Sequence, residues 1–172
     1  DDIPEYVQDR VSDIGIVGEN IVAERRARVT IVERLGFGKC RLAICVPERG
    51  SLKKLAQLRG KRIATSYPSI LKRFLASEHC PAEIVEISGS VEITPSLDVA
   101  DATCDIVSTG STARVNGLRV IHTVMHSEAV MIANASCLRS PQTRAAIDQF
   151  RVRLRSCLKA QGKKYVMMKA PV

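Results

Sequence analysis

The sequence predicts an α/β fold, and three observations lead to this prediction. Short apolar runs rich in β-branched residues alternate with amphipathic segments along the chain, which is typical of βα units with mixed or parallel sheets. The 172 residues are enough for one domain or for two small lobes with a real core. The composition, with 45% apolar and 26% charged residues, is that of a globular protein rather than of a disordered or coiled-coil chain.

Strands and helices can be placed in order from the spacing of the apolar residues. Strands are expected over residues 14–17, 41–46, 62–65, 83–87, 105–107, 119–125 and 129–133. Helices are expected over residues 4–10, 51–58, 68–77 and 141–160, with a short one after Gly89. Pro68 and Pro141 fit the first turn of a helix, so these two helix starts are the best defined.

Two loops that mix Gly or Pro with polar residues, 36–38 and 47–51, are the best hinge candidates. They predict a discontinuous first lobe, residues 1–43 and 129–172, and a second lobe over residues 44–128. The chain begins on an amphipathic segment with no strand before it and stops just after an apolar stretch. We therefore expect it to be a piece of a longer protein.

The net charge of +8 favours an anionic partner, which could be a nucleic acid, a membrane surface or a phosphorylated small molecule. The basic residues form no unbroken run, and a chain with no Trp and 3% aromatic residues lacks base-stacking platforms. No apolar run approaches the roughly 20 residues that cross a bilayer, and residues 1–10 do not resemble a signal peptide. We expect a cytoplasmic protein without a membrane or nucleic-acid partner, with a basic nucleic-acid-binding protein as an alternative.

Cysteine and histidine spacing argues against metal and hydrolytic sites. The six cysteines show no CxxC spacing and lie mostly in apolar stretches, as buried free thiols do. His122 and His126 are four residues apart, but their segment is expected to be a strand rather than a helix. No Ser-His-Asp, Cys-His or HExxH pattern occurs, so neither a hydrolytic triad nor a protein metal motif is expected.

The most specific candidate site is the loop that follows the expected strand 105–107. It consists of small and hydroxyl-bearing residues, namely Ser108, Thr109, Gly110, Ser111 and Thr112. Open α/β sheets bind ligands beyond the carboxyl ends of their strands, and successive amides with hydroxyl groups can hold a phosphate there. Asp105 can accept hydrogen bonds from sugar hydroxyls, so the pattern favours a sugar phosphate. A Ser/Thr-rich turn without a ligand is the alternative.

Three other segments have weaker functional patterns. Ser66 and Tyr67 open the helix 68–77, and Glu92 follows a Ser-Gly-Ser loop, so both places put a helix start near the sheet edge. Each is more often an ordinary capped helix than a ligand site. Glu92 can complement a helix dipole or serve as an active-site carboxylate. Gly15 and Gly18 permit close approach of a ligand to the backbone or simply tight packing.

Residues 89–112 (GSVEITPSLDVADATCDIVSTGST) closely resemble the signature region of the ATP phosphoribosyltransferase family. The resemblance covers essentially the whole chain in order. It continues in residues 1–20 (DDIPEYVQDRVSDIGIVGEN), 35–47 (LGFGKCRLAICVP), 60–75 (GKRIATSYPSILKRFL), 116–119 (NGLR) and 163–171 (KKYVMMKAP).

The resemblance implies a fold and an activity. Members of this family catalyse the magnesium-dependent attack of adenine N1 of ATP on phosphoribosyl pyrophosphate, which opens histidine biosynthesis. Their catalytic part has two α/β lobes similar to type II periplasmic binding proteins, with the active site in the cleft between the lobes. The implied partners are ATP, phosphoribosyl pyrophosphate, Mg²⁺ and further copies of the chain in a homo-oligomer. A non-catalytic phosphosugar-binding module of the same fold is the alternative.

The resemblance also implies residue roles. Asp105 would face the ribose hydroxyls, and the loop residues Ser108 to Thr112 would hold the 5-phosphate. Glu92 and Asp101 match acidic positions around the same pocket and join Asp105 as candidate catalytic residues. The candidates for the nucleotide and the cleft are Gly15, Gly18, Glu19, Asn20, Ser66 and Tyr67.

The chain departs from the family pattern at a few positions. Asp98 stands where Gly is usual, which adds negative charge near the expected pocket and constrains the backbone if that Gly has a positive φ. Thr103 and Ala113 replace larger apolar residues, so they are expected to affect packing. The ending 163–171 resembles the family's long form, which carries a histidine-sensing domain.

Overall fold

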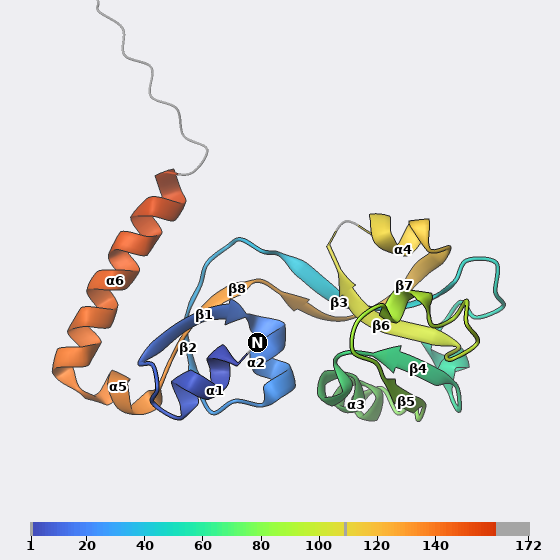
Figure 1. Ribbon diagram of the computed structural model, residues 1–172, viewed down its shortest axis with the longest axis horizontal. Coiled ribbons are helices and arrows are strands. Elements are labelled where there is room, and N and C mark those ends of the chain that lie inside the picture. Colours follow the sequence, from blue (N-terminus) through green and yellow to red (C-terminus); the bar gives the residue numbers. More distant parts are fainter. Residues whose placement is uncertain (1, 109, 161–172) are drawn as a thin grey trace, which may run out of the picture.

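A computed structural model describes residues 2–108 and 110–160, and it places two sheets in two separate lobes (Figure 1). The three-stranded lobe contains β1 (Ile14–Gly18), β2 (Thr30–Arg34) and β8 (Ala129–Ala133), with α1 (Ile3–Gln8), α2 (Glu19–Arg25), α5 (Ala135–Arg139) and α6 (Pro141–Ala160). The five-stranded lobe contains β3 (Cys40–Pro47), β4 (Arg62–Thr65), β5 (Glu83–Glu86), β6 (Ala102–Val107) and β7 (Leu118–Ser127). Its helical segments are η1 (Leu55–Leu58), α3 (Pro68–Ser77), η2 (Val91–Ile93) and α4 (Ser111–Val115).

The two sheets differ in strand direction. The first has the order β1-β8-β2 and is antiparallel throughout. The second has the order β5-β4-β6-β3-β7, in which β4 is parallel to β5 and β6, whereas β3 runs antiparallel to β6 and β7. The fold is therefore α/β with mixed sheets. The parallel part is confined to the βα units of the five-stranded lobe.

The chain crosses between the lobes twice, from β2 to β3 and from β7 to β8 (Figure 1). The two crossings are bonded to each other, because the Leu35 amide donates to the Ala129 carbonyl and the Ala129 amide donates to the Phe37 carbonyl, each at 2.9 Å. The Gly36 amide also donates to Glu128 Oε2 at 2.9 Å. These bonds join the two crossings into one paired segment.

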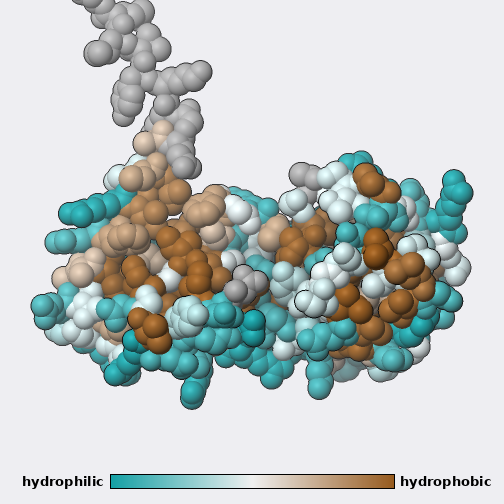
Figure 2. Space-filling model, viewed as in Figure 1, coloured by the Kyte–Doolittle hydropathy of each residue, from teal (hydrophilic) through white to brown (hydrophobic). Residues whose placement is uncertain are grey.

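Each sheet has helices on both faces. In the five-stranded lobe, α3 packs with Leu42, Ile44, Ile63 and Cys104 on one face, and Ala113 of α4 packs with Ala43 and Val107 on the other. In the three-stranded lobe, α1 and α2 bury Val7 and Val22 against β8, and α6 buries Ile147 on the opposite face. Figure 2 shows apolar residues gathered on the visible face of the three-stranded lobe, beside α6. This two-sided packing supplies the core that the chain length predicts.

The structure corrects several expected elements. β2, α2, α4 and α5 were not expected, and β6 starts at Ala102 rather than at Asp105. The helix expected over 51–58 is reduced to η1, because Gln57 Oε1 accepts the amides of Lys53 and Lys54 and holds that segment extended. Cys157 is exposed on α6 and Cys40 is partly exposed, so not every cysteine is a buried thiol. No helix within the described residues has the length and apolar character required to span a bilayer.

A carboxylate between two arginines holds α6 against β2. Glu33 of β2 pairs with Arg151, at 3.1 Å, and with Arg155, and its side chain is 9% exposed. Burial alone would raise the pKa of Glu33, but the hydrogen bonds and charges of Arg155 and Arg151 outweigh burial and lower it. Glu33 therefore stabilises the fold above its unfolded pKa of about 4.3, and this contribution is lost as the pH falls through the lowered folded pKa.

The substitution Glu33→Gln is expected to lower the free energy of unfolding by about 1 to 2 kcal/mol at pH 7, because it removes the charge from these hydrogen bonds. The difference from the unsubstituted chain should shrink as the pH falls below about 4. Urea unfolding followed by circular dichroism at pH 7 and at pH 3 measures both values. Glu78→Gln, at an exposed position, is the control. An equal cost at both pH values would contradict the charge argument.

Candidate active site

Asp105 lies near the carboxyl end of β6, on the sheet face that α4 covers. It is paired directly with Ala43 of β3, and its Oδ1 accepts the amide of Ile106 at 2.7 Å. Burial raises the pKa of Asp105, the negative charge of Glu92 raises it further, and the Ile106 hydrogen bond partly offsets both. A half-buried carboxylate is therefore held at the edge where open α/β sheets bind ligands.

The candidate phosphate loop begins directly after β6. Gly110, with φ of 79°, starts α4, and Ala113 anchors this helix to the same sheet face through Val107 and Cys45. Ser111 and Thr112 are exposed in the first turn of α4, where the backbone amides have no acceptor within the helix. Ser108 is exposed as well, whereas Thr109 lies outside the described residues. Asp105 and this loop are thus brought together, as the sequence predicts.

Glu92 joins Asp105 on this face. Val91, its neighbour in η2, is buried with Ala64 and Ala100. Ala64 pairs with Thr103 of β6, and Thr103 shares the face of Asp105 because residues two apart in a strand point the same way. The structure therefore places two carboxylates and a hydroxyl-rich loop on one side of the sheet.

Asp101 lies at the opposite end of β6. Its Oδ2 accepts the Arg62 amide at 2.8 Å and lies 3.5 Å from Arg62 Nε. The six residues of β6 separate it from the phosphate loop by about 20 Å. The structure does not bring Asp101 to Asp105, because Asp101 pairs with the start of β4 at the amino edge of the sheet.

Asp98 lies at this amino edge too, which corrects the expected charge near the pocket. Its carbonyl accepts Arg62 Nη1 at 3.0 Å, and its carboxylate lies 3.8 Å from Arg62 Nη2. Its φ is 58°, so Asp98 does adopt the left-handed conformation suited to Gly, which Asp tolerates better than most residues. The buried Thr103 occupies the sheet beside Ala64, and Ala113 is the apolar anchor of α4.

Ser66 and Tyr67 lie at the carboxyl end of β4 and line a cavity. A cavity of about 630 Å³ is bounded there by both lobes, with Glu5, Ile21, Glu24 and Arg25 on one side and Ser66, Tyr67, Pro68, Ser69 and Glu86 on the other. Ser66 Oγ donates to the Ile87 carbonyl at 2.7 Å. The Tyr67 amide donates to Thr65 Oγ1, which in turn donates to the Cys104 carbonyl. These bonds fix the β4 to α3 turn on β6.

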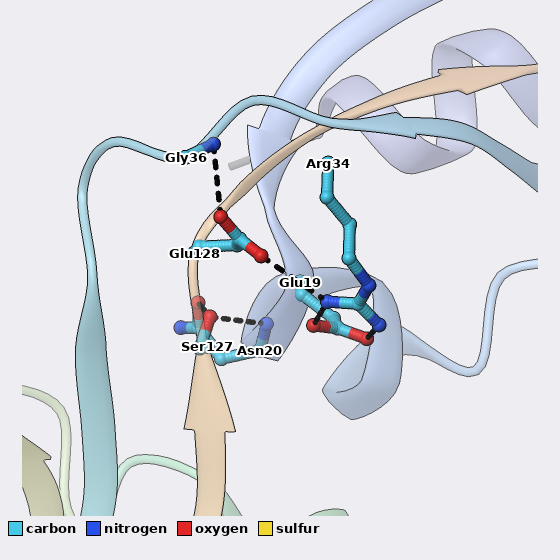
Figure 3. Close-up of polar contacts among 6 residues, drawn as sticks. All are labelled: Glu19, Asn20, Arg34, Gly36, Ser127 and Glu128. Atoms are coloured by element: carbon cyan, nitrogen blue, oxygen red, sulfur yellow. Dashed lines mark hydrogen bonds and ion pairs between the residues drawn. The ribbon is translucent and has the colours of Figure 1, made fainter.

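Gly15, Gly18 and Glu19 have structural contacts. A Cβ at Gly15 would lie 2.5 Å from Ile3 Cγ2, so this glycine allows α1 to pack closely on β1. Glu19 forms a two-point ion pair with Arg34, which also lies 3.7 Å from Glu128 (Figure 3). Glu19 therefore belongs to the junction between the lobes, whereas Gly15 packs within the three-stranded lobe.

The sequence did not indicate the contacts through which α2 reaches the five-stranded lobe. Glu24 accepts the amides of Ser69 and Ile70 at 2.8 and 2.9 Å, so a residue of one lobe caps a helix of the other. Asn20 bonds to Ser127 of β7 and to Tyr67. No local sequence pattern predicts these contacts, because the partners are 45 to 107 positions apart. They could be predicted only if the position of α2 beside α3 were already known.

Comparison with known proteins assigns the family. The model of the ATP phosphoribosyltransferase family matches residues 1–156. An ATP phosphoribosyltransferase of Cytophaga hutchinsonii is 47% identical over 99% of this chain and 59% of its own length, and one of Bacteroides fragilis is 44% identical over 99% and 60%. The chain thus spans about three fifths of the curated relatives that it matches.

Solved structures agree with the sequence comparison. The ATP phosphoribosyl transferase (HisG:HisZ) complex from Thermotoga maritima matches with a TM-score of 0.81 and 25% identity over 93% of this chain and 77% of that chain. The substrate-binding protein of an amino acid ABC transporter matches with a TM-score of 0.62 and 12% identity over 92% of this chain and 69% of that chain, which shows a shared fold alone. With a family model that matches most of its length, the chain belongs to the ATP phosphoribosyltransferase family.

Proposed function

We propose that this chain carries the phosphoribosyl-binding part of an enzyme that joins adenine N1 of ATP to 5-phosphoribosyl 1-pyrophosphate, the first step of histidine biosynthesis. The products are phosphoribosyl-ATP and pyrophosphate. The single observation that carries the proposal is the placement of Asp105, Ser108 and residues 110–112 at the end of one strand, on the sheet face that α4 covers. Family membership supports the same reaction.

In this proposal the phosphate loop binds the 5-phosphate of the substrate, and Asp105 binds its ribose. The first-turn amides of α4 and the hydroxyls of Ser111 and Thr112 hold the 5-phosphate. Among the described residues, only the Ile106 amide donates to the Asp105 carboxylate, and it does so at Oδ1. Oδ2 is thus the acceptor for a ribose hydroxyl. This acceptor role requires the ionised form, which the raised pKa restricts to a higher pH range than usual.

Positioning and electrostatics account for the chemistry. As pyrophosphate leaves, positive charge develops on the ribose, and the carboxylates of Asp105 and Glu92 lie on the face that would stabilise it. Adenine N1 supplies the electron pair that captures the ribose carbon, so no side chain is required as a nucleophile. Holding the two substrates in the cleft supplies the remaining acceleration.

The acidic face also fits Mg²⁺. Mg²⁺ keeps much of its water shell in proteins, so the ion would be held largely by substrate phosphates and water. Asp105 and Glu92 are the carboxylates that would contact such an ion directly or through water. When bound, Mg²⁺ would neutralise the pyrophosphate leaving group.

We further propose that the protein acts as a homo-oligomer in the cytoplasm, without a nucleic-acid or membrane partner. The matching Thermotoga maritima structure is a complex of two kinds of chain, which supports assembly in the family. Both proposed substrates are free nucleotides or sugar phosphates, which fits a cytoplasmic location.

The substitution Thr112→Val tests the phosphate loop. It is expected to weaken binding of phosphoribosyl pyrophosphate by about 1 to 3 kcal/mol, because it removes a hydroxyl donor to a charged group at nearly constant volume. Equilibrium titration of both chains in magnesium buffer measures the difference. Thr30→Val, at an exposed position of β2, is the matched control. Unchanged affinity in Thr112→Val would remove Thr112 from the site.

A further inference from the structure

Asn20 is buried where three elements meet. It lies in the first turn of α2, is 7% exposed, and contacts Ser127 at the end of β7 and Tyr67 at the start of α3 (Figure 3 shows the Ser127 contact). Ser127 is 5% exposed. Two buried polar side chains at the junction of the lobes therefore depend on each other for their hydrogen bonds.

The structure places Asn20 Oδ1 towards Ser127 and Nδ2 towards Tyr67. The Asn20 backbone amide donates to Ser127 Oγ at 3.0 Å, and the Ser127 hydroxyl donates to Asn20 Oδ1 at 2.8 Å. With Oδ1 facing Ser127, Nδ2 faces Tyr67 and donates to its Oη at 3.3 Å. Tyr67 accepts this bond and keeps its own proton.

Gly18 leaves room for the Asn20 side chain in this position. A Cβ at position 18 would lie 2.4 Å from Asn20 Oδ1, so a larger residue there would displace the amide.

Tyr67 lines the cavity of about 630 Å³ between the lobes, and its hydroxyl lies beside Asn20 Nδ2. Within the described residues, Asn20 is the only hydrogen-bond partner of that hydroxyl. The same cavity is lined by Glu5, Glu24 and Glu86, with Arg25 as the single basic residue. An excess of carboxylates disfavours a phosphate group here and favours a neutral group that has both donors and acceptors.

We propose that Asn20 and Ser127 are positioning residues that set the Tyr67 hydroxyl as a hydrogen-bond donor to a neutral acceptor atom of a bound substrate. This inference rests on the proposed function for the identity of the substrate. Of the two substrates, ATP carries a large neutral part, its nucleoside, and the nucleoside is the part that the acidic cavity favours, so ATP is the probe. The phosphate loop after β6 serves phosphoribosyl pyrophosphate, and Asp105 beside it is near enough to act on the pKa of Tyr67.

The phenol titration of Tyr67 tests the direction of the Asn20 hydrogen bond. Burial raises the pKa of Tyr67, and the charge of Asp105, followed by Cys40 and Glu24, raises it further, whereas the bond from Asn20 lowers it. A donor to Oη stabilises the phenolate, while an acceptor of the phenol proton stabilises the neutral form. If removal of the bond raises the pKa of Tyr67, Asn20 donates to Oη; if removal lowers this pKa, Asn20 accepts the phenol proton.

We expect the pKa of Tyr67 to rise in Asn20→Leu, which removes the donor. It should also rise in Ser127→Ala, which keeps the surroundings of Tyr67 but releases the amide to rotate. Absorbance at alkaline pH, with circular dichroism recorded at each pH, measures the titration of the three tyrosines, and Tyr67→Phe identifies the relevant one. Asn116→Leu is the control for an exposed asparagine. A fall, or no change, in either variant would overturn the inference.

A double-mutant cycle with ATP tests the link to the substrate. Asn20→Leu is expected to weaken ATP binding about fivefold, the scale of one neutral hydrogen bond, and to cause no further loss when Tyr67 is already Phe. Binding of phosphoribosyl pyrophosphate should be unchanged. If Asn20→Leu weakened ATP binding just as much when residue 67 is Phe, Asn20 would have only a structural role. Failure of the unsubstituted chain to bind either substrate would count against the proposed function, and the phenol titration would still decide the direction of the Asn20 bond.

Discussion

Replacement of Asp105 by Asn is expected to weaken binding of ribose 5-phosphate by about 10- to 100-fold, the range for losing hydrogen bonds to a charged group. Asp105 is the half-buried carboxylate beside the phosphate loop, and its Oδ2 is the proposed acceptor for a ribose hydroxyl. The substituted amide has one acceptor oxygen and cannot replace the charge. Inorganic phosphate, which has no ribose, should bind both chains equally. Calorimetric titrations of the two ligands measure the comparison.

Two further titrations make this result specific. Asp9→Asn, at an exposed position after α1, should leave both affinities unchanged and controls for net charge. Thr112→Val should weaken both ligands, because each carries a phosphate. An equal loss of ribose 5-phosphate and inorganic phosphate in Asp105→Asn would assign Asp105 to the fold of the loop rather than to the sugar.

Replacement of Thr65 by Val is expected to lower the free energy of unfolding by about 2 to 4 kcal/mol, the cost of leaving two buried polar groups without partners. Thr65 is fully buried at the carboxyl end of β4. Its hydroxyl donates to the Cys104 carbonyl at 2.6 Å and accepts the Tyr67 amide at 2.9 Å. Valine has nearly the same shape, so packing is preserved and the loss reports the hydrogen bonds. Denaturant unfolding measures the change.

The matched variant is Thr65→Ser, which keeps the hydroxyl and loses a methyl group. It should cost about 1 kcal/mol, less than Thr65→Val. The two bonds join β4, β6 and the start of α3, so Thr65→Val should also weaken ATP binding through Tyr67. If serine proved more costly than valine, packing rather than hydrogen bonding would hold this turn.

The elements that sequence reasoning placed correctly have strong local signals. β4, α3 and β8 occur at the expected bounds, because apolar runs and the proline at the start of α3 define them without tertiary information. β2 was missed because it is a short edge strand with charged residues at its end. α2 was missed because its contacts are with segments distant in sequence: Val22 packs against β8, and Glu24 caps α3.

The candidate site likewise has features that the sequence predicts and features that depend on tertiary contacts. The loop after β6 could be predicted, since a strand followed by Ser, Thr and Gly is local chemistry. Asp101 could not be placed, because the register of β6 against β4 and the position of Arg62 decide which sheet edge it reaches. Asn20 and Tyr67 were expected in the cleft, but their mutual bond and its direction depend on Ser127, 107 residues from Asn20.

The most direct test of the central claim is a calorimetric titration of this chain with phosphoribosyl pyrophosphate in magnesium buffer. Ribose 5-phosphate and a short DNA duplex are the comparison ligands. We expect saturable binding of phosphoribosyl pyrophosphate, weaker binding of ribose 5-phosphate, and no binding of the duplex. Binding of the duplex with a steep loss of affinity at higher salt, and no binding of either sugar phosphate, would contradict it.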